Sequence, residues 1–165
     1  MKTVRTDPPR AGGERALLTG WLDFYRATIE MKCEGLDRRQ LAEAAVAPSH
    51  FSLLGLVRHL SEMERGYFRN GIGGENLPLI YCSDKDPDGD FLLAASADPD
   101  EAFTVWREER KRANQVIARS ELSDAPAAGS RHSVRWALVK VIGEYARHTG
   151  HADLLRERID GATGD

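Results

Sequence analysis

Three side chains with metal-binding chemistry follow one another along the last long amphipathic segment of the chain. Glu144, His148 and His151 stand four and then three residues apart. On a helix, at about 100° per residue, they fall within roughly 60° of one another, beside the apolar stripe that faces the core. Side chains four residues apart start about 5–6 Å from each other at Cβ, so two of them can bind one ion. The spacing therefore favours a metal site with carboxylate and imidazole ligands.

A further ligand has to come from a facing helix, and His59 is placed to supply it. It is the only histidine within the apolar face of another expected helix, whereas His50 and His132 lie in expected loops. Helical bundles often build metal sites from inward side chains of facing helices. Three protein ligands leave one coordination position open, which is typical of catalytic sites. The alternative is that His59 is a core histidine whose hydrogen bonds are satisfied inside the protein.

Four long amphipathic segments have to position these side chains. Apolar residues recur at helical spacing over residues 14–34, 53–70, 99–119 and 134–159. Capping residues mark most of their ends, namely Ser52, Asp98 and Ser133 before three of them and Gly35 and Gly161 after two. No segment of the sequence shows a convincing pattern for a β-strand. The sequence therefore predicts an all-α fold, a four-helix bundle, in one domain that spans residues 1–165.

Shorter segments connect the expected helices. Residues 1–13 form a partly mobile lead-in, residues 37–41 a short helix, and residues 121–132 a loop. The longest connection, residues 71–97, joins the second and third long helices and is rich in glycine, proline and aspartate. Connections of this length are often functional, for example as a lid or a pocket wall.

Several residues near this connection have alternative interpretations. Residues 84–90 resemble the first half of a calcium-binding loop, but Ala95 stands where that loop needs a bidentate glutamate, so an acidic turn is the better interpretation.

Tyr67 and Trp106, from the helices on either side of this connection, are candidates for the apolar walls of a pocket. Arg147 is expected to point away from Glu144 and is therefore a poor candidate for contact with a substrate.

Charged residues are expected on solvated surfaces. These comprise the mixed run 107–112 and the outer side of the second long helix, with Arg58, Glu62, Arg65 and Arg69. The net charge of −3 disfavours a nucleic-acid-binding protein. No apolar run is long enough to span a membrane and no secretory leader is present, so a cytoplasmic location is expected.

Other catalytic chemistries find little support. Cys33 and Cys82 form no CxxC pair and are expected to be reduced and inert. The sequence contains no GxSxG turn for a nucleophilic serine and no glycine-rich phosphate loop. Of the patterns considered, the histidine and glutamate cluster is thus the one that points to a reaction.

The two helices that carry the candidate ligands resemble the signature helices of a known superfamily. Residues 52–60 (SLLGLVRHL) and 144–156 (EYARHTGHADLLR) are similar to the DinB superfamily. They are most similar to its uncharacterised-domain branch, which is related to mycothiol transferases and to the mycothiol-dependent maleylpyruvate isomerase. The similarity covers nearly the whole chain, from residues 7–9 (DPP) to residues 158–161 (RIDG).

The resemblance implies a four-helix bundle that holds a divalent metal through three residues, which match His59, Glu144 and His148. Glutamate at position 144 is similar to the isomerase branch, whereas many other members have histidine there. The isomerase has a further domain, which is not expected within residues 1–165. His151 departs from the simplest pattern, and it is a fourth ligand, a residue that supports a ligand, or a proton carrier near metal-bound water. Zinc is the expected ion, with nickel or iron as alternatives.

The resemblance also implies a reaction, namely metal-dependent S-transfer from a thiol or a related isomerisation. The partners would be a low-molecular-weight thiol such as mycothiol and an electrophile, and the protein would be a homodimer. Three alternatives stay open: a metal-dependent hydrolase on the same scaffold, a non-catalytic metal- or ligand-binding protein, and a metal-free helical interaction module.

Overall fold

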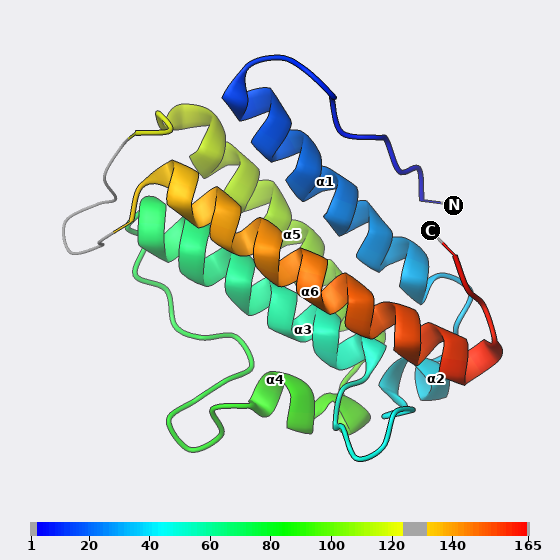
Figure 1. The fold of residues 1–165 in the computed structure, drawn as a ribbon. Coiled ribbons are helices and arrows are strands. Elements are labelled where there is room, and N and C mark those ends of the chain that lie inside the picture. The colour runs from blue at the N-terminus through cyan, green and yellow to red at the C-terminus, as the bar shows by residue number, and fades with distance from the viewer. Residues whose placement is uncertain (1–2, 124–131, 165) are drawn as a thin grey trace.

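The computed structural model describes residues 3–123 and 132–164, and every regular element in these ranges is helical (Figure 1). The long helices are α1 (Glu14–Cys33), α3 (Leu53–Met63), α5 (Pro99–Arg119) and α6 (Val134–Asp160). The π-helix η1 (Glu64–Ile72) continues directly from α3. The short elements are α2 (Arg38–Ala42), α4 (Gly89–Leu92) and the 3₁₀ helix η2 (Ala94–Ser96). The predicted all-α fold is confirmed, while most of the expected loop 121–132 lies outside the described residues.

The long helices pack side by side, with α1 and α6 running in one direction and α3 and α5 in the other (Figure 1). Helix α6 packs against both α1 and α3, and α5 packs against α3 and η1. Because α3 and α5 are parallel neighbours, the chain has to return along the bundle between them. Residues 73–97, here called the crossover, make this return and include α4 and η2. None of the described helices combines the length and the apolar character needed to cross a membrane.

The centre of the bundle contains a charged pair. The Arg26 guanidinium on α1 donates hydrogen bonds of 2.8 and 2.6 Å to the Glu64 carboxylate on η1, and both side chains are buried. The Tyr145 hydroxyl donates to the same carboxylate at 2.8 Å, and the Trp106 indole N–H donates to Tyr145 at 2.9 Å. Trp106 therefore lies in the core and completes a buried polar network, and the prediction that it forms a pocket wall is wrong.

The charged side chains of the second long helix do not lie on a solvated outer face, as the sequence had suggested. Arg58 and Glu62 are buried, at 7% and 5% exposure. Arg65 and Arg69, further along the helix, donate to Glu109 of α5 at 2.5 and 2.9 Å. Glu109 is itself buried, so the mixed-charge run of α5 is only partly solvated. These residues are covered because the helix has the crossover and α5 as neighbours.

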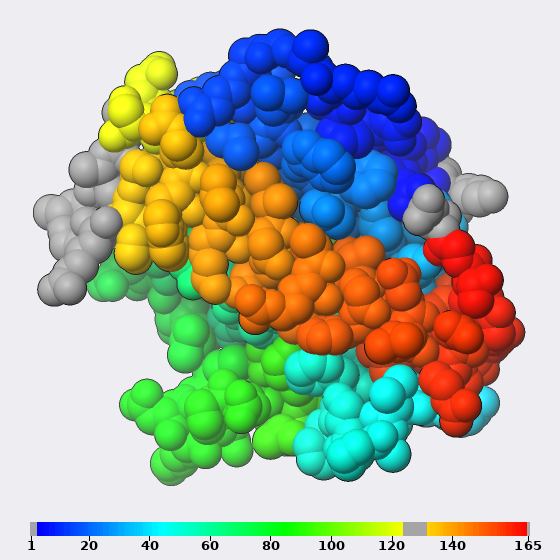
Figure 2. Space-filling view, in the orientation of Figure 1, coloured from blue at the N-terminus to red at the C-terminus, as the bar shows by residue number. Residues whose placement is uncertain are grey.

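Two buried side chains of α3 fasten the crossover to the bundle. One carboxylate oxygen of Glu62 accepts hydrogen bonds from three consecutive main-chain N–H groups, at 2.7, 2.6 and 3.1 Å, in residues 80–82. Arg58 donates to the main-chain oxygens of Gly89 and Asp90 at 2.9 and 3.0 Å. In the space-filling view, the crossover (green) and the segment before α3 (cyan) lie along the lower side of α6 (Figure 2). The crossover is thus a packed layer over α3.

Candidate metal centre

Three of the four predicted ligands converge between α3 and α6. His59, Glu144 and His148 each offer one ligand atom, and these atoms lie within 4.8 Å of one another. The Nε2 atom of His148 lies 3.7 Å from Oε2 of Glu144, and the rings of His59 and His148 are 4.7 Å apart between centroids. Bonds of ~2.0–2.2 Å around a tetrahedral ion place its ligand atoms about 3.4 Å apart. The three side chains therefore need only small adjustments to surround one ion.

A carboxylate from the crossover fixes the orientation of His59. Oδ2 of Asp90, in α4, lies 2.8 Å from Nδ1 of His59, and the Asp90 side chain is buried. A carboxylate only accepts hydrogen bonds, so Nδ1 carries the proton of the neutral ring. In this tautomer Nε2 is the atom free to bind an ion, and it is buried and has no hydrogen-bond partner among the described residues. This arrangement is typical of metal-binding histidines, whose second nitrogen donates to a carboxylate.

His148 is held in the neutral form that a ligand needs. Burial, with the neighbouring rings of His59 and His151, lowers the pKa of His148 to about 4. Its Nδ1 lies 3.2 Å from Nδ1 of His151. If His148 binds an ion through Nε2, its proton is on Nδ1 and is donated to His151. His151 is therefore placed to support His148, and it is not part of the three-residue cluster.

Two cationic side chains lie beside the carboxylate of Glu144. Burial acts to raise the pKa of Glu144, but the hydrogen bond and charge of Lys140, 2.5 Å away, bring that pKa below its ordinary value. The guanidinium of Arg147 lies 4.0 Å from the same carboxylate, so the prediction that Arg147 points away from Glu144 is wrong. Residues three apart on a helix share a face, which explains the contact. Glu144 is thus ionised at neutral pH, as a metal ligand must be.

Two phenylalanines that the sequence analysis missed form the apolar wall of the site. The Phe91 ring stacks on His59 at 4.8 Å between centroids, and Phe51 stacks on Phe91 at 4.6 Å. Phe51 also lies 6.0 Å from His148 and 5.1 Å from His151. Both phenylalanines lie outside the four long helices, so no helical periodicity marks them as core residues. Their rings place the histidines in an environment of low polarity.

The other candidate residues lie away from this wall. Tyr67 is half-buried and its ring lies 6.0 Å from that of Trp136, near the start of α6. His50 and His132 are both exposed, as predicted for loop histidines. The expectation that Tyr67 lines the pocket therefore finds no contact with the histidine cluster to support it.

The cysteines are free thiols, and neither is activated as a nucleophile. Burial raises the pKa of Cys33 to about 12 and that of Cys82 to about 11. Both groups are therefore protonated at neutral pH, which agrees with the prediction that they are inert.

Comparison with known proteins identifies the family to which this chain belongs. The family described as mycothiol-S-transferase matches residues 17–161, from α1 to the end of α6, including His59, Glu144 and His148. The chain belongs to the mycothiol-S-transferase family. This family is part of the DinB-like superfamily, so the resemblance noted in the sequence is confirmed. A search among curated proteins finds no match. Membership of the mycothiol-S-transferase family indicates S-transferase-like activity that uses a thiol substrate.

Proposed function

We propose that the protein is a metal-dependent S-transferase that joins mycothiol, or a similar small thiol, to an electrophile. The observation that carries this proposal is the buried, unpartnered Nε2 atom of His59, in the cluster with Glu144 and His148. Two imidazoles and one carboxylate suit zinc, and nickel or iron are the alternatives. The cytoplasmic location and the homodimer stay predictions from the sequence and the family.

An ion bound there would supply Lewis acidity, which lowers the pKa of a thiol so that the thiolate is the nucleophile at neutral pH. The residues of the chain prepare the site for this step. Asp90 orients His59, and Lys140 keeps Glu144 ionised. Phe51 and Phe91 cover the rings of the histidines and limit the access of water.

The carboxylate of Asp90 should contribute strongly to metal affinity. Asp90→Asn keeps the size of the side chain but removes the charge that orients His59, so zinc binding should weaken about 10–100-fold. Competition with a chromophoric chelator measures this affinity. The matched control is Asp88→Asn, which changes an exposed acid in the same crossover and should leave the affinity unchanged. Equal zinc affinities for Asp90→Asn and the wild type would contradict the assigned role.

Turnover of a thiol with an electrophile tests the function itself. Tag-free, zinc-loaded protein is assayed with mycothiol and other small thiols against bromobimane-like and chlorinated acceptors. We expect the wild type to catalyse the transfer and a chelator to stop it. His148→Ala should abolish the activity, whereas the exposed control His50→Ala should retain it. His151→Ala should keep its metal while the pH dependence of the rate changes. Equal rates for the wild type and His148→Ala would refute the proposal and favour a binding protein.

A further inference from the structure

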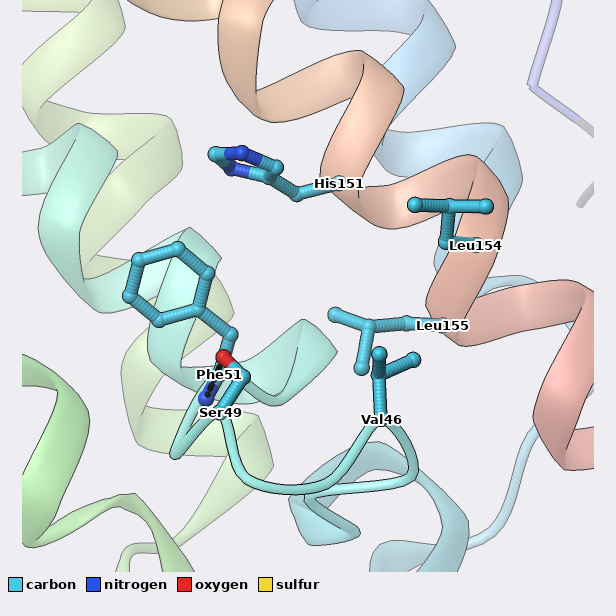
Figure 3. Close-up of a pocket in the computed structure, with 6 residues that line it drawn as sticks. All are labelled: Val46, Ser49, Phe51, His151, Leu154 and Leu155. Carbon is cyan, nitrogen blue, oxygen red and sulfur yellow. Dashed lines mark hydrogen bonds between the residues drawn. The ribbon is translucent and has the colours of Figure 1, made fainter.

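A cavity of about 240 Å³ opens between α6 and the segment that precedes α3 (Figure 3). Its lining consists of four apolar side chains, one hydroxyl and one imidazole, from Val46, Ser49, Phe51, His151, Leu154 and Leu155. Figure 3 shows His151 and Phe51 facing Val46 and the two leucines across the open space. The family assignment does not by itself give this cavity a role.

The cavity borders the histidine cluster directly. Two of its lining residues, Phe51 and His151, also contact His148, with ring centroids 6.0 and 5.1 Å away. Nδ1 of His151 lies 3.2 Å from Nδ1 of His148. The cavity therefore lies beside a metal ligand, with Phe51 and His151 at the boundary between the two.

The side chains that line the cavity disfavour the binding of a charged ligand. The described lining contains no lysine, arginine, aspartate or glutamate. The nearby cations Lys140 and Arg147 already lie 2.5 and 4.0 Å from Glu144. A carboxylate in the cavity would thus lose part of its hydration without gaining a cationic side chain from the lining, which disfavours its binding. The Ser49 hydroxyl and the His151 ring are the polar groups that can orient a ligand.

We propose that this cavity binds the electrophilic acceptor, and that the acceptor is a neutral molecule with a small apolar group. This inference rests on the proposed S-transferase function. An apolar cavity of about 150 Å³ is enough to hold benzene, so the cavity next to His151 accommodates one aromatic ring with a reactive substituent. In the transfer, the thiol sulfur forms a bond to the acceptor carbon, a halide leaves with its electron pair, and the thiol proton passes to solvent.

Ligand binding without turnover tests the cavity independently of catalysis. The binding of neutral 4-fluorobenzyl alcohol and anionic 4-fluorobenzoate is followed by ¹⁹F NMR on the zinc-loaded chain and on the metal-free chain, in which no bound ion can attract the carboxylate. We expect the alcohol to bind about tenfold or more tightly than the benzoate, because the lining offers no counter-ion. Leu154→Asp puts a charge at the cavity and should weaken binding of the alcohol by about tenfold or more.

The chain offers a matched control for this variant. Val139 is on the same helix and is 55% exposed, against 56% for Leu154, so Val139→Asp adds an equal charge at an equally exposed site. Val139→Asp should leave binding of the alcohol unchanged. Val46→Trp, which fills the cavity without adding charge, should abolish that binding.

The inference would be overturned by no detectable binding of the alcohol to the wild type, or by equal binding of the alcohol to the wild type and Leu154→Asp. An assay of transfer to neutral chlorinated acceptors completes the test. A higher KM in Leu154→Asp than in Val139→Asp would support the acceptor site, whereas equal KM values would refute it. If the alcohol binds as expected but no thiol is transferred, the S-transferase proposal fails while the selectivity of the cavity for neutral ligands is upheld.

Discussion

Replacing His59 with alanine should remove stoichiometric metal from the protein. His59 is the only member of the three-residue cluster that comes from α3, because Glu144 and His148 are neighbours on α6. Without it, the site has two ligands from adjacent turns of one helix, which is too few for a tight site. Metal content, measured by mass spectrometry on protein purified without an affinity tag, should fall from about one zinc ion per chain to a small fraction of that value.

The control for this experiment is His50→Ala, which removes an exposed histidine outside the cluster. This variant should retain the metal content of the wild type. His151→Ala should also retain it, since His151 supports His148 and is not part of the cluster. If His59→Ala still bound a full equivalent of zinc, the ion would have to be bound elsewhere and the assigned ligands would be wrong.

Arg26→Met should lower the free energy of unfolding by about 3–5 kcal/mol, as expected when one partner of a buried ion pair is removed. The substitution leaves the Glu64 carboxylate inside the bundle, where its remaining donor among the described residues is the Tyr145 hydroxyl. The native pair is close, and although burial opposes the charge of Arg26, Glu64 raises its pKa overall. Urea denaturation of the metal-free proteins at neutral pH measures the difference.

Two further variants separate the loss of the pair from a general effect of substitution. Glu108→Gln breaks an exposed pair with Arg112 on α5 and should cost less than about 1 kcal/mol. Combining Arg26→Met with Glu64→Leu removes both buried charges, so part of the lost stability should return. A loss below about 1 kcal/mol for Arg26→Met alone would show that the pair is not a major source of stability.

The long helices were predictable because their signals are local. The predicted ranges 14–34 and 134–159 agree with α1 and α6 to within one residue. The side chains of Ser52 and Ser133 accept hydrogen bonds from main-chain N–H groups in the first turns of their helices, as capping residues do. The π-helical turns of η1 were not predicted, because a pattern that repeats every 3.6 residues does not reveal a change of hydrogen-bond register.

The candidate site was predictable only where it lies on these helices. The spacing of Glu144 and His148, and the place of His59 on an apolar face, indicated their convergence. Asp90 and Phe91 come from the crossover, where no periodic pattern shows which side chains are buried. The burial of Arg58 has the same origin, since the sequence of a helix does not reveal that the crossover will cover its polar side.

We expect the crossover to open as one unit, because Glu62 binds it through three hydrogen bonds. Three consecutive amides, in residues 80–82, share one carboxylate oxygen as acceptor, so they can hardly detach one at a time. Asp90, which orients His59, belongs to the same layer and is held by Arg58. Local unfolding of such a unit is cooperative. Hydrogen exchange at the amides of residues 80–82 should therefore report how often His59 loses its orienting carboxylate, so the opening of the crossover should set how well the partly exposed His59 ring is ordered.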